Sequence, residues 1–165
     1  SIVTKQSAGN LFHQQLARQL AEFLPVHLRK NQGIMALSDA FCLYNRARGT
    51  DLISPDDMYR ACCLFDRLNL PLVLKRFESS GVIVIQDSEM TDERMAERIV
   101  RLIESDEEYR EQQCVSAVDV AHSLKISVIL AQQQLLSAES TGVLCRDESI
   151  EGVRFYLTRI CFPTA

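Results

Sequence analysis

Two kinds of side chain in this sequence are able to do chemistry, paired carboxylates and thiols. Asp56-Asp57 and Glu107-Glu108 are adjacent acids, and two carboxylates can act together as general acid and base. The first pair stands in the predicted first turn of a helix, where the helix dipole favours acids, and we interpret the second as part of a solvated acidic linker. Sequence patterns for a serine nucleophile elbow, a phosphate-binding glycine loop and a zinc protease are absent. We therefore predict no catalytic residues, no enzyme and no small-molecule substrate.

The thiols also indicate no catalytic or metal site. Most of the six cysteines lie in apolar periodic segments, so we expect buried free thiols in a reducing compartment. Adjacent Cys62 and Cys63 suggest a redox pair, but neighbouring cysteines rarely bridge, and Cys62 falls on an apolar helix face. There is no Cys-x-x-Cys motif, and the three histidines are not spaced as metal ligands. We predict neither a metal nor a cofactor.

Composition and charge describe the scaffold that carries these residues. With 165 residues, 47% hydrophobic and 24% charged, the chain is typical of a globular protein, and its apolar runs are of strand length. Residues 1–80 hold 10 Lys and Arg against 7 Asp and Glu, a net +3; residues 81–165 hold 8 against 15, a net −7. This asymmetry favours two modules. Because the chain lacks an initiator Met and a signal peptide, we expect it to be part of a longer protein.

The elements of the first half follow from periodicity and capping signals. An amphipathic helix with Leu11, Phe12, Leu16, Leu20, Phe23 and Leu24 is predicted to end at Pro25. A short strand at 34–37 and a short helix bearing Phe41, Tyr44 and Ala47, ended by Gly49, are expected next. Ser54 and Pro55 then predict the start of a helix that runs to Asn69. Two β-rich runs, 72–77 and 82–85, predict a hairpin.

The second half repeats this order. Thr91 begins a helix, Val115 marks a short strand, and Ser116-x-x-Asp119 is a capping box before a helix with Val118, Ala121 and Leu124 inward. Ser127 caps a helix expected to bury Val128, Ala131, Leu135 and Ala138, and a hairpin with its turn at 147–152 follows. The repeat predicts an internal duplication. We predict an α+β fold, mainly α, of two tandem winged-helix domains, residues 1–88 and 89–165.

Winged helices commonly bind DNA through the third helix and neutralise phosphates with basic residues. The candidate recognition helix 54–69 has a net charge of −1, and 127–141 contains no Lys or Arg. Gln132, Gln133 and Gln134 could read adenine edges, but without phosphate neutralisation. Duplex binding is thus not expected of the second unit. A nucleic-acid-binding, transcription-type protein remains the alternative, using the first unit's basic residues Arg46, Arg48, Lys75 and Arg76.

Short motifs, by their order and spacing, carry a family resemblance over essentially the whole chain. They are Gly33-Ile34-Met35-Ala36-Leu37, Asn45-Arg46-Ala47-Arg48-Gly49, Leu52-Ile53-Ser54-Pro55-Asp56-Asp57, Leu70-Pro71-Leu72, Gly81-Val82-Ile83-Val84-Ile85, Leu144-Cys145-Arg146-Asp147 and Glu151-Gly152-Val153-Arg154-Phe155-Tyr156. The sequence resembles the C-terminal region of the GLUE-domain-bearing, Vps36-type subunits of ESCRT-II.

The resemblance implies a non-enzymatic scaffold in endosomal sorting of ubiquitinated membrane proteins, the multivesicular body pathway. It implies a cytoplasmic protein recruited to endosomal membranes and assembled with two other tandem winged-helix subunits. The lipid- and ubiquitin-binding GLUE domain precedes this region in the family, so membrane contact is expected only indirectly, and no nucleic acid is expected.

The resemblance also implies contact sites. The small subunit, which brings an aromatic, proline-rich segment, is expected to contact the second winged helix at Leu144, Cys145, Arg146 and Asp147, with Phe155 and Tyr156 nearby. Alternatively, Leu144, Phe155 and Tyr156 are core residues of the wing, and Asp147 is a solvated turn residue. The sister subunit is expected to contact helix 10–24 and the turn containing Arg46 and Arg48. Alternatively, the whole apolar face of this helix packs into the core of its own winged helix.

Overall fold

The structure is a computed structural model that describes the backbone of residues 5–162 and the side chains of residues 9–162. The chain divides into two compact units that meet between Glu89 and Met90. The first unit comprises α1 (Lys5–Lys30), β1 (Ile34–Ala36), α2 (Leu37–Arg48), α3 (Pro55–Cys62), β2 (Leu72–Arg76) and β3 (Ile83–Asp87). The second comprises α4 (Asp92–Ser105), α5 (Glu107–Gln112), β4 (Cys114–Val115), α6 (Ala117–Leu124), α7 (Val128–Ser140), β5 (Leu144–Ser149), β6 (Gly152–Leu157) and α8 (Thr158–Cys161).

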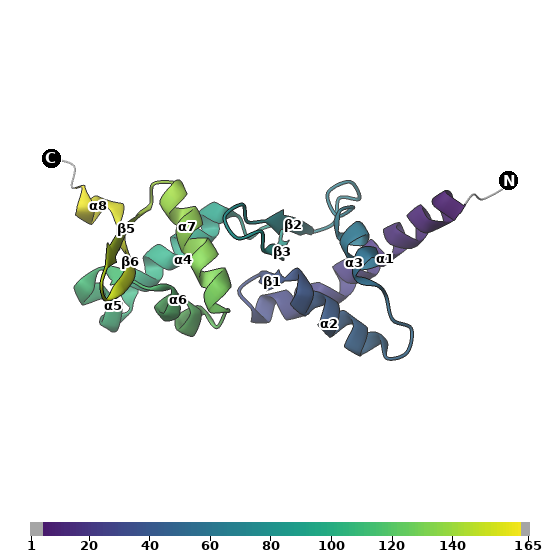
Figure 1. Cartoon of the computed structure of the whole chain (residues 1–165), viewed down its shortest axis with the longest axis horizontal. Coiled ribbons are helices and arrows are strands. Elements are labelled where there is room, and N and C mark those ends of the chain that lie inside the picture. The colour runs from purple at the N-terminus through teal and green to yellow at the C-terminus, as the bar shows by residue number, and fades with distance from the viewer. Residues whose placement is uncertain (1–4, 163–165) are drawn as a thin grey trace. The chain divides into compact units, whose positions relative to one another are not determined.

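Both units have the topology of a winged helix (Figure 1). Each contains a three-stranded antiparallel sheet in which the first strand pairs with the third, in the orders β1-β3-β2 and β4-β6-β5. In each, the last two strands form the hairpin called the wing. The predicted mainly helical α+β fold of two tandem winged helices is confirmed.

Left-handed backbone positions recur at equivalent bends of the two units. The connection between α2 and α3 passes through Gly49 at φ 77°. The equivalent connection between α6 and α7 passes through Lys125 at φ 56°. The approach to each wing passes through Asn69 at φ 53° and Gly142 at φ 84°. Because non-glycine residues rarely adopt this conformation, its recurrence supports the predicted duplication.

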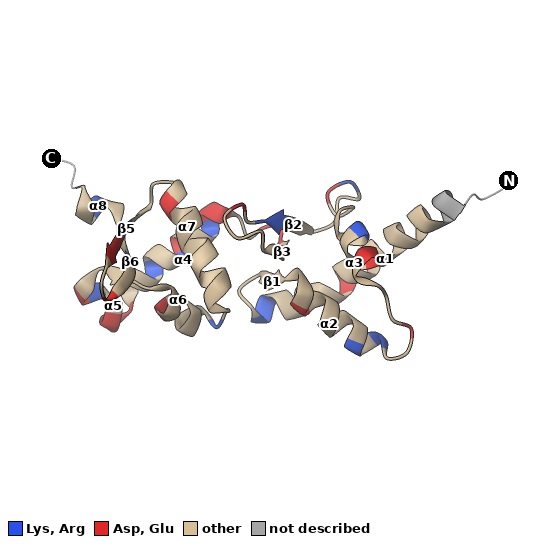
Figure 2. Cartoon of the chain, in the orientation of Figure 1, with Lys and Arg blue, Asp and Glu red and all other residues tan. Residues whose placement is uncertain are grey.

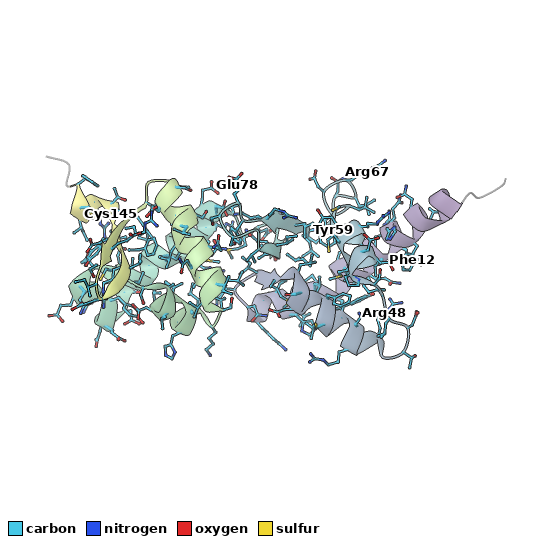
Figure 3. All side chains as sticks on the ribbon, in the orientation of Figure 1. Phe12, Arg48, Tyr59, Arg67, Glu78 and Cys145 are labelled. Carbon is cyan, nitrogen blue, oxygen red and sulfur yellow. A yellow bond between two sulfur atoms is a disulfide. The ribbon has the colours of Figure 1, made fainter. Side chains whose placement is uncertain are left out.

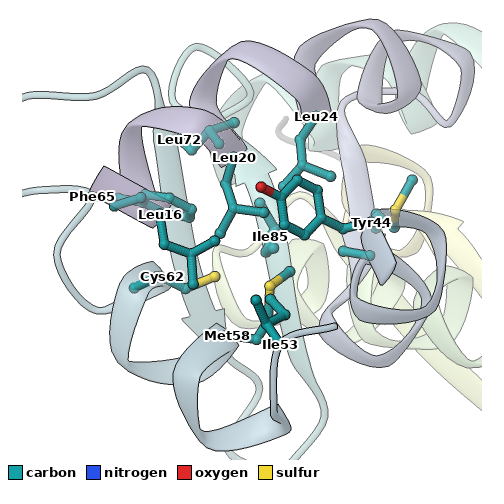
Figure 4. Packing of buried hydrophobic residues seen from close by; sticks show 14 of the residues in the cluster. Leu16, Leu20, Leu24, Tyr44, Ile53, Met58, Cys62, Phe65, Leu72 and Ile85 are labelled. Carbon is teal, nitrogen blue, oxygen red and sulfur yellow. The ribbon is translucent and has the colours of Figure 1, made fainter. Parts of the chain in front are cut away.

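The core of the first unit is built on one face of α1 (Figure 4). Leu16, Leu20, Leu24 and Leu28 recur every four residues, and all are essentially inaccessible to solvent. The helix therefore continues through Pro25, where we expected it to end. Proline removes one helical hydrogen bond, but burial of leucines on both sides of it outweighs that loss.

The N-terminal part of α1 differs from the prediction. Leu11 is 61% exposed and Phe12 is 42% exposed, so neither faces the core as expected. No residue from 9 to 15 is buried, and this end of the helix projects beyond α3 in Figure 1. We call residues 9–15 the α1 overhang.

The third helix of the first unit is also shorter than predicted. Ser54 caps α3 in a reciprocal capping box with Asp57, as the sequence indicates, but the α-helix ends at Cys62 and turns fill the chain to Asn69. Phe65 stays buried within these turns. In α2, Tyr44 is buried as expected, whereas Ala47 is exposed.

In the second unit the acidic stretch after α4 is not a linker. Glu107 and Glu108 form the first turn of α5, where Asp106 accepts a hydrogen bond from the backbone N–H of Glu108. Tyr109 buries its ring and lies 3.3 Å from the Ser123 hydroxyl. Acids at the start of a short helix complement its dipole, which is why this charged segment is helical.

The capping boxes are confirmed, but the predicted inward faces shift. Ser116 and Asp119 cap α6 reciprocally, and Ser127 caps α7 through the backbone N–H of Leu130. Val118 is 63% exposed and Val128 is 47% exposed, so their predicted burial is wrong. The positions buried on α7 are Leu130, Ala131, Gln133, Gln134, Leu135 and Ala138.

The second wing is longer than predicted. β5 extends to Ser149, so Asp147 is a strand residue paired with Arg154 rather than a turn residue. Only two residues separate β5 from β6. The pairing register decides which wing side chains reach solvent.

Candidate partner-binding surfaces

The sheet register divides the six candidate residues of the second unit between two faces. Successive side chains on a strand point to opposite faces, and Leu144 pairs with Leu157 while Arg146 pairs with Phe155. Leu144 and Phe155 are each only 2% exposed, so both belong to the core of the wing. A partner could therefore contact only the residues next to them, whose side chains point to the opposite face of the sheet.

The opposite face of the sheet carries a mixed polar and thiol surface. Tyr156 lies between Cys114 and Cys145, and Arg154 lies opposite Asp147. We call these five side chains the wing face. Asp147 is exposed, Cys145, Tyr156 and Arg154 are half-buried, and Cys114 is buried. Three of the predicted contact residues are thus brought together: Cys145, Asp147 and Tyr156.

Interactions within the wing face hold Arg154 and Tyr156 in place. Arg154 Nη1 lies 3.8 Å from Cys114 Sγ and 3.5 Å from Gln112 Oε1. A hydrogen bond with Cys114 raises the pKa of the Tyr156 phenol above its ordinary value. The phenol O–H is thus engaged with Cys114, and the hydroxyl oxygen can accept a hydrogen bond from a partner.

Arg146 lies apart from this group. Its guanidinium pairs with Glu139 at 3.2 Å, near the end of α7, and with Glu148 at 3.3 Å, on its own strand. The pair with Glu139 ties the wing to α7. In the structure Arg146 is therefore a bridge within the unit rather than a member of the wing face.

A second surface lies where α6, α7 and the wing meet. It is a groove of about 420 Å³ that we call the wing groove, lined by Ser116, Ala117, Val118, Val128, Gln132, Glu151, Gly152, Val153, Arg154 and Phe155. The prediction missed this site because it assigned Val118 and Val128 to the core. Both stand in the first turn of a helix, where 3.6-residue periodicity is a weak guide, and a valine one or two residues after a capping serine was the available signal.

The charge on the recognition helices is unsuited to duplex DNA. α7 has no basic residue, and it carries no blue segment in Figure 2. In α3, Arg60 pairs with Asp56 at 2.8 Å. Lys75, one of the cations of the nucleic-acid alternative, lies 4.9 Å from the centre of the Phe77 ring, whereas Arg76 is exposed.

In the first unit the two candidate arginines behave differently. Arg46 is exposed, whereas Arg48 is held locally. The Arg48 guanidinium donates to the Tyr44 hydroxyl at 3.1 Å and lies 2.7 Å from the Asp51 carboxylate (Figure 3). Arg48 therefore shapes the connection between α2 and α3.

The α1 overhang borders a groove of about 510 Å³ against α3. Its lining residues are Gly9, Asn10, His13, Tyr59, Arg60, Cys63 and Leu64. Tyr59 is 40% exposed at this groove, and Phe12 is exposed on the overhang (Figure 3). His13 Nε2 lies 3.0 Å from Asp57 Oδ1 and so ties the overhang to the capping box of α3.

The Asp57 carboxylate and the Cys62 thiol, both candidates for chemistry in the sequence, have structural roles. The hydrogen bond with His13 is the main cause that lowers the pKa of Asp57, and the carboxylate also accepts from the backbone of Ser54. Burial raises the pKa of the Cys62 thiol to about 12, so it stays protonated and is a poor nucleophile. Cys62 and Cys63 are both free.

One pair of cysteines contradicts the expectation of free thiols. Cys145 and Cys161 are joined by a disulfide that links β5 to α8 (Figure 3). Of the free cysteines, Cys42 and Cys63 are exposed, and Cys62 and Cys114 are buried. Sequence spacing gave no indication of this pairing, because Cys161 becomes a neighbour of β5 only once the wing has folded.

Within residues 5–162, no group of three or more His, Cys, Asp or Glu side chains is arranged to hold a metal ion. Among the described helices, none combines the length and the apolar character needed to cross a membrane.

Comparisons with known proteins show the family to which the chain belongs. The model of the EAP30/Vps36 family matches residues 1–148. The chain belongs to the EAP30/Vps36 family. It is 43% identical to Vacuolar protein-sorting-associated protein 36 of Dictyostelium discoideum, covering 94% of this chain and 26% of that protein. It is 41% identical to the human protein of the same name, covering 93% of this chain and 39% of that protein.

The predicted family resemblance is confirmed, and the chain spans well under half the length of these relatives. Among solved structures, it is similar to a chain of the ESCRT-II endosomal trafficking complex with a TM-score of 0.61 and 23% identity, covering 99% of this chain and 98% of that chain. That similarity extends over both winged helices and supports the fold.

Proposed function

We propose that the chain is a non-enzymatic assembly module of ESCRT-II that acts in endosomal sorting of ubiquitinated membrane proteins. In this proposal it is cytoplasmic and is recruited to endosomal membranes as part of the complex. Membership of the EAP30/Vps36 family supports it. The observation that carries it is the character of α7, a recognition helix with no basic residue that begins with exposed Val128 and Ile129.

This helix suits protein partners for a physical reason. A DNA-binding surface gains most of its affinity by neutralising phosphates, which α7 cannot do because its one charged residue is Glu139 and Glu151 lines the same groove as Val128. Exposed aliphatic side chains instead stabilise a complex by losing contact with water. The module is therefore suited to binding folded or extended polypeptide.

We assign the contact with the small ESCRT-II subunit to the wing face. Asp147 supplies an exposed carboxylate that can pair with a cation or accept backbone N–H groups of a docked extended segment. Half-buried Tyr156 and Cys145 lie on the same face and provide apolar contact for aromatic and proline side chains. Arg154 lies opposite Asp147 and presents a donor beside it. Leu144 and Phe155 support this surface from the core.

We assign the contact with the sister subunit to the first unit. The α1 overhang leaves Leu11 and Phe12 exposed beside a groove that includes Tyr59. Aromatic and aliphatic side chains at such a groove are typical of the centre of a protein interface. Exposed Arg46 and locally held Arg48 are the candidate polar contacts on the neighbouring turn.

The test is size-exclusion chromatography with light scattering on the chain alone and mixed with the other two ESCRT-II subunits. Coelution in a complex of fixed stoichiometry is the expected result. Duplex DNA provides the parallel control, and the chain should not shift it at any salt concentration. A chain that stays monomeric with both partners would overturn the proposal.

A further inference from the structure

The disulfide between Cys145 and Cys161 lies at one edge of the wing face. Cys145 is a wing-face residue on β5, and Cys161 is the last residue of α8. β5 is an edge strand, since its one neighbour in the sheet is β6. The disulfide therefore fastens a short helix to the open edge of the surface that carries Asp147.

Without the disulfide, α8 is weakly attached. Four residues are too few to form a stable helix by themselves. The backbone N–H of Thr158 donates to the carbonyl of Val143 at 3.1 Å, and Arg159 pairs with Glu104 on α4. That ion pair joins exposed side chains and so contributes little. The disulfide is the strongest link between α8 and β5.

The disulfide is reachable by small thiols from the Cys161 side. Cys161 is exposed and Cys145 is half-buried. Exposed disulfides are typically the labile ones that exchange with glutathione, whereas the buried Cys62 thiol, with its raised pKa, is protected from exchange. The Cys145–Cys161 pair is thus the one in the described chain with both a partner and access to solvent.

We propose that Cys145 and Cys161 form a reversible thiol–disulfide switch that controls access to the wing face. In the oxidised form, α8 is held against β5 by the bond to Cys145, and Ile160 on this helix is 42% exposed. In the reduced form, α8 separates from the edge, and Cys145 is free to contact the small subunit. This inference rests on the proposed function, because it concerns the same surface.

The chemistry balances with glutathione as the redox partner. One cysteine thiolate attacks a sulfur of glutathione disulfide, forms a mixed disulfide and releases one glutathione. The second cysteine thiolate then attacks the mixed disulfide and releases the other glutathione. Two electrons pass from the cysteine pair to glutathione, and the two protons leave the cysteine thiols. Excess reduced glutathione reverses both steps.

The first experiment concerns the chain alone. It is equilibrated with reduced and oxidised glutathione in graded ratios, alkylated and analysed by peptide mass spectrometry. We expect an intramolecular Cys145–Cys161 crosslink that appears and disappears reversibly with the ratio. Cys161→Ser should abolish it, whereas Cys63→Ser, which removes an exposed thiol of the first unit, should leave it unchanged. A pair that never crosslinks, or that cannot be reduced by glutathione, would overturn the switch.

The second experiment measures binding to the recombinant small subunit of ESCRT-II. We expect the oxidised chain to bind several-fold more weakly than the reduced chain. Cys161→Ser should bind like the reduced chain at every glutathione ratio, because it retains the wing face and lacks the crosslink. Equal binding of both redox forms overturns the switch and leaves the proposed function standing. Absence of binding by the reduced chain and by Cys161→Ser overturns the proposed function and the switch with it, while the crosslinking result still reports on the disulfide alone.

Discussion

The helices that precede the two wings, α3 in the first unit and α7 in the second, differ in length, charge and burial. α3 has 8 residues, and it carries the Asp56–Arg60 pair and the contact between Asp57 and His13 of α1. α7 has 13 residues, buries six of them including two glutamines, and has no charge before Glu139. The same topology therefore supports a short helix with ion pairs in one unit and a longer helix without basic residues in the other.

This difference teaches that the fold and the function are carried by different residues. The sheet orders and left-handed bends are the same in both units, and they fix the fold. The candidate partner surfaces differ, since the first unit presents Leu11 and Phe12 on the α1 overhang and the second presents the wing face. We therefore expect each unit to bind a different partner.

The largest expected effect is on stability. Phe65 is 1% exposed in the first unit and Phe155 is 2% exposed in the second. Phe65→Ala and Phe155→Ala should each lower the free energy of unfolding by about 3–5 kcal/mol, because each leaves a cavity. Chemical denaturation followed by amide chemical shifts would show which unit is affected. Loss of less than about 1 kcal/mol would mean that the ring is not a core residue.

The next effect is on association. Asp147→Lys should weaken binding of the small subunit by about 2 kcal/mol or more, because it places a like charge where a carboxylate pairs with the partner. Titration calorimetry measures the affinity. Thermal stability should stay near that of the wild type, because Asp147 is exposed.

Glu111→Lys is the matched control for this substitution, since Glu111 is an exposed acid on α5 and the change in net charge is the same. Its affinity should equal that of the wild type. Val128→Asp distinguishes the two surfaces of the second unit. If it weakens binding and Asp147→Lys does not, the small subunit occupies the wing groove instead of the wing face.

The stabilisation from the capping box of α3 should depend on pH. Asp57→Ala and Asp119→Ala should each lower the free energy of unfolding by about 1 kcal/mol. The pKa of Asp57 is lowered by His13, so its contribution is complete above about pH 4 and is lost as pH falls through the lowered pKa. Denaturation between pH 2 and pH 7 should show the wild-type advantage over Asp57→Ala shrinking at low pH. A pH-independent difference would show that the ionised carboxylate is not the stabilising species.

The smallest effect is expected at an exposed ion pair. The side chains of Arg60 and Asp56 are 63% and 69% exposed. Arg60→Gln should change the free energy of unfolding by less than about 0.5 kcal/mol, because water and salt screen the pair. Thermal denaturation at low and high salt checks this. A larger change would indicate that Arg60 packs against the groove through its aliphatic stem.

Much of the fold could be predicted from the sequence because its signals are local. Ser54, Ser116 and Ser127 mark helix starts through hydrogen bonds to nearby backbone, and all three caps are present. Pro25 and the acidic stretch at Glu107 were misread because burial of Leu28 and Tyr109, which depends on distant residues, outweighed local preference.

The candidate site was predicted less well. The motif around Leu144 to Asp147 located the wing, but the pairing register decides that Asp147 and Tyr156 share one face while Leu144 and Phe155 are buried on the other. Register depends on how far the strands extend, and the predicted turn at 147–152 was too long. The Cys145–Cys161 pair arises from tertiary contact alone.

The most direct test of separate partner surfaces is a crossed binding measurement. Asp147→Lys in the second unit and Phe12→Asp in the first are each titrated with the small subunit and with the sister subunit. We predict that Asp147→Lys loses the small subunit and keeps the sister subunit, and that Phe12→Asp does the reverse. If either variant loses both partners while remaining folded, or if the losses are exchanged, the assignment of one partner to each unit is wrong.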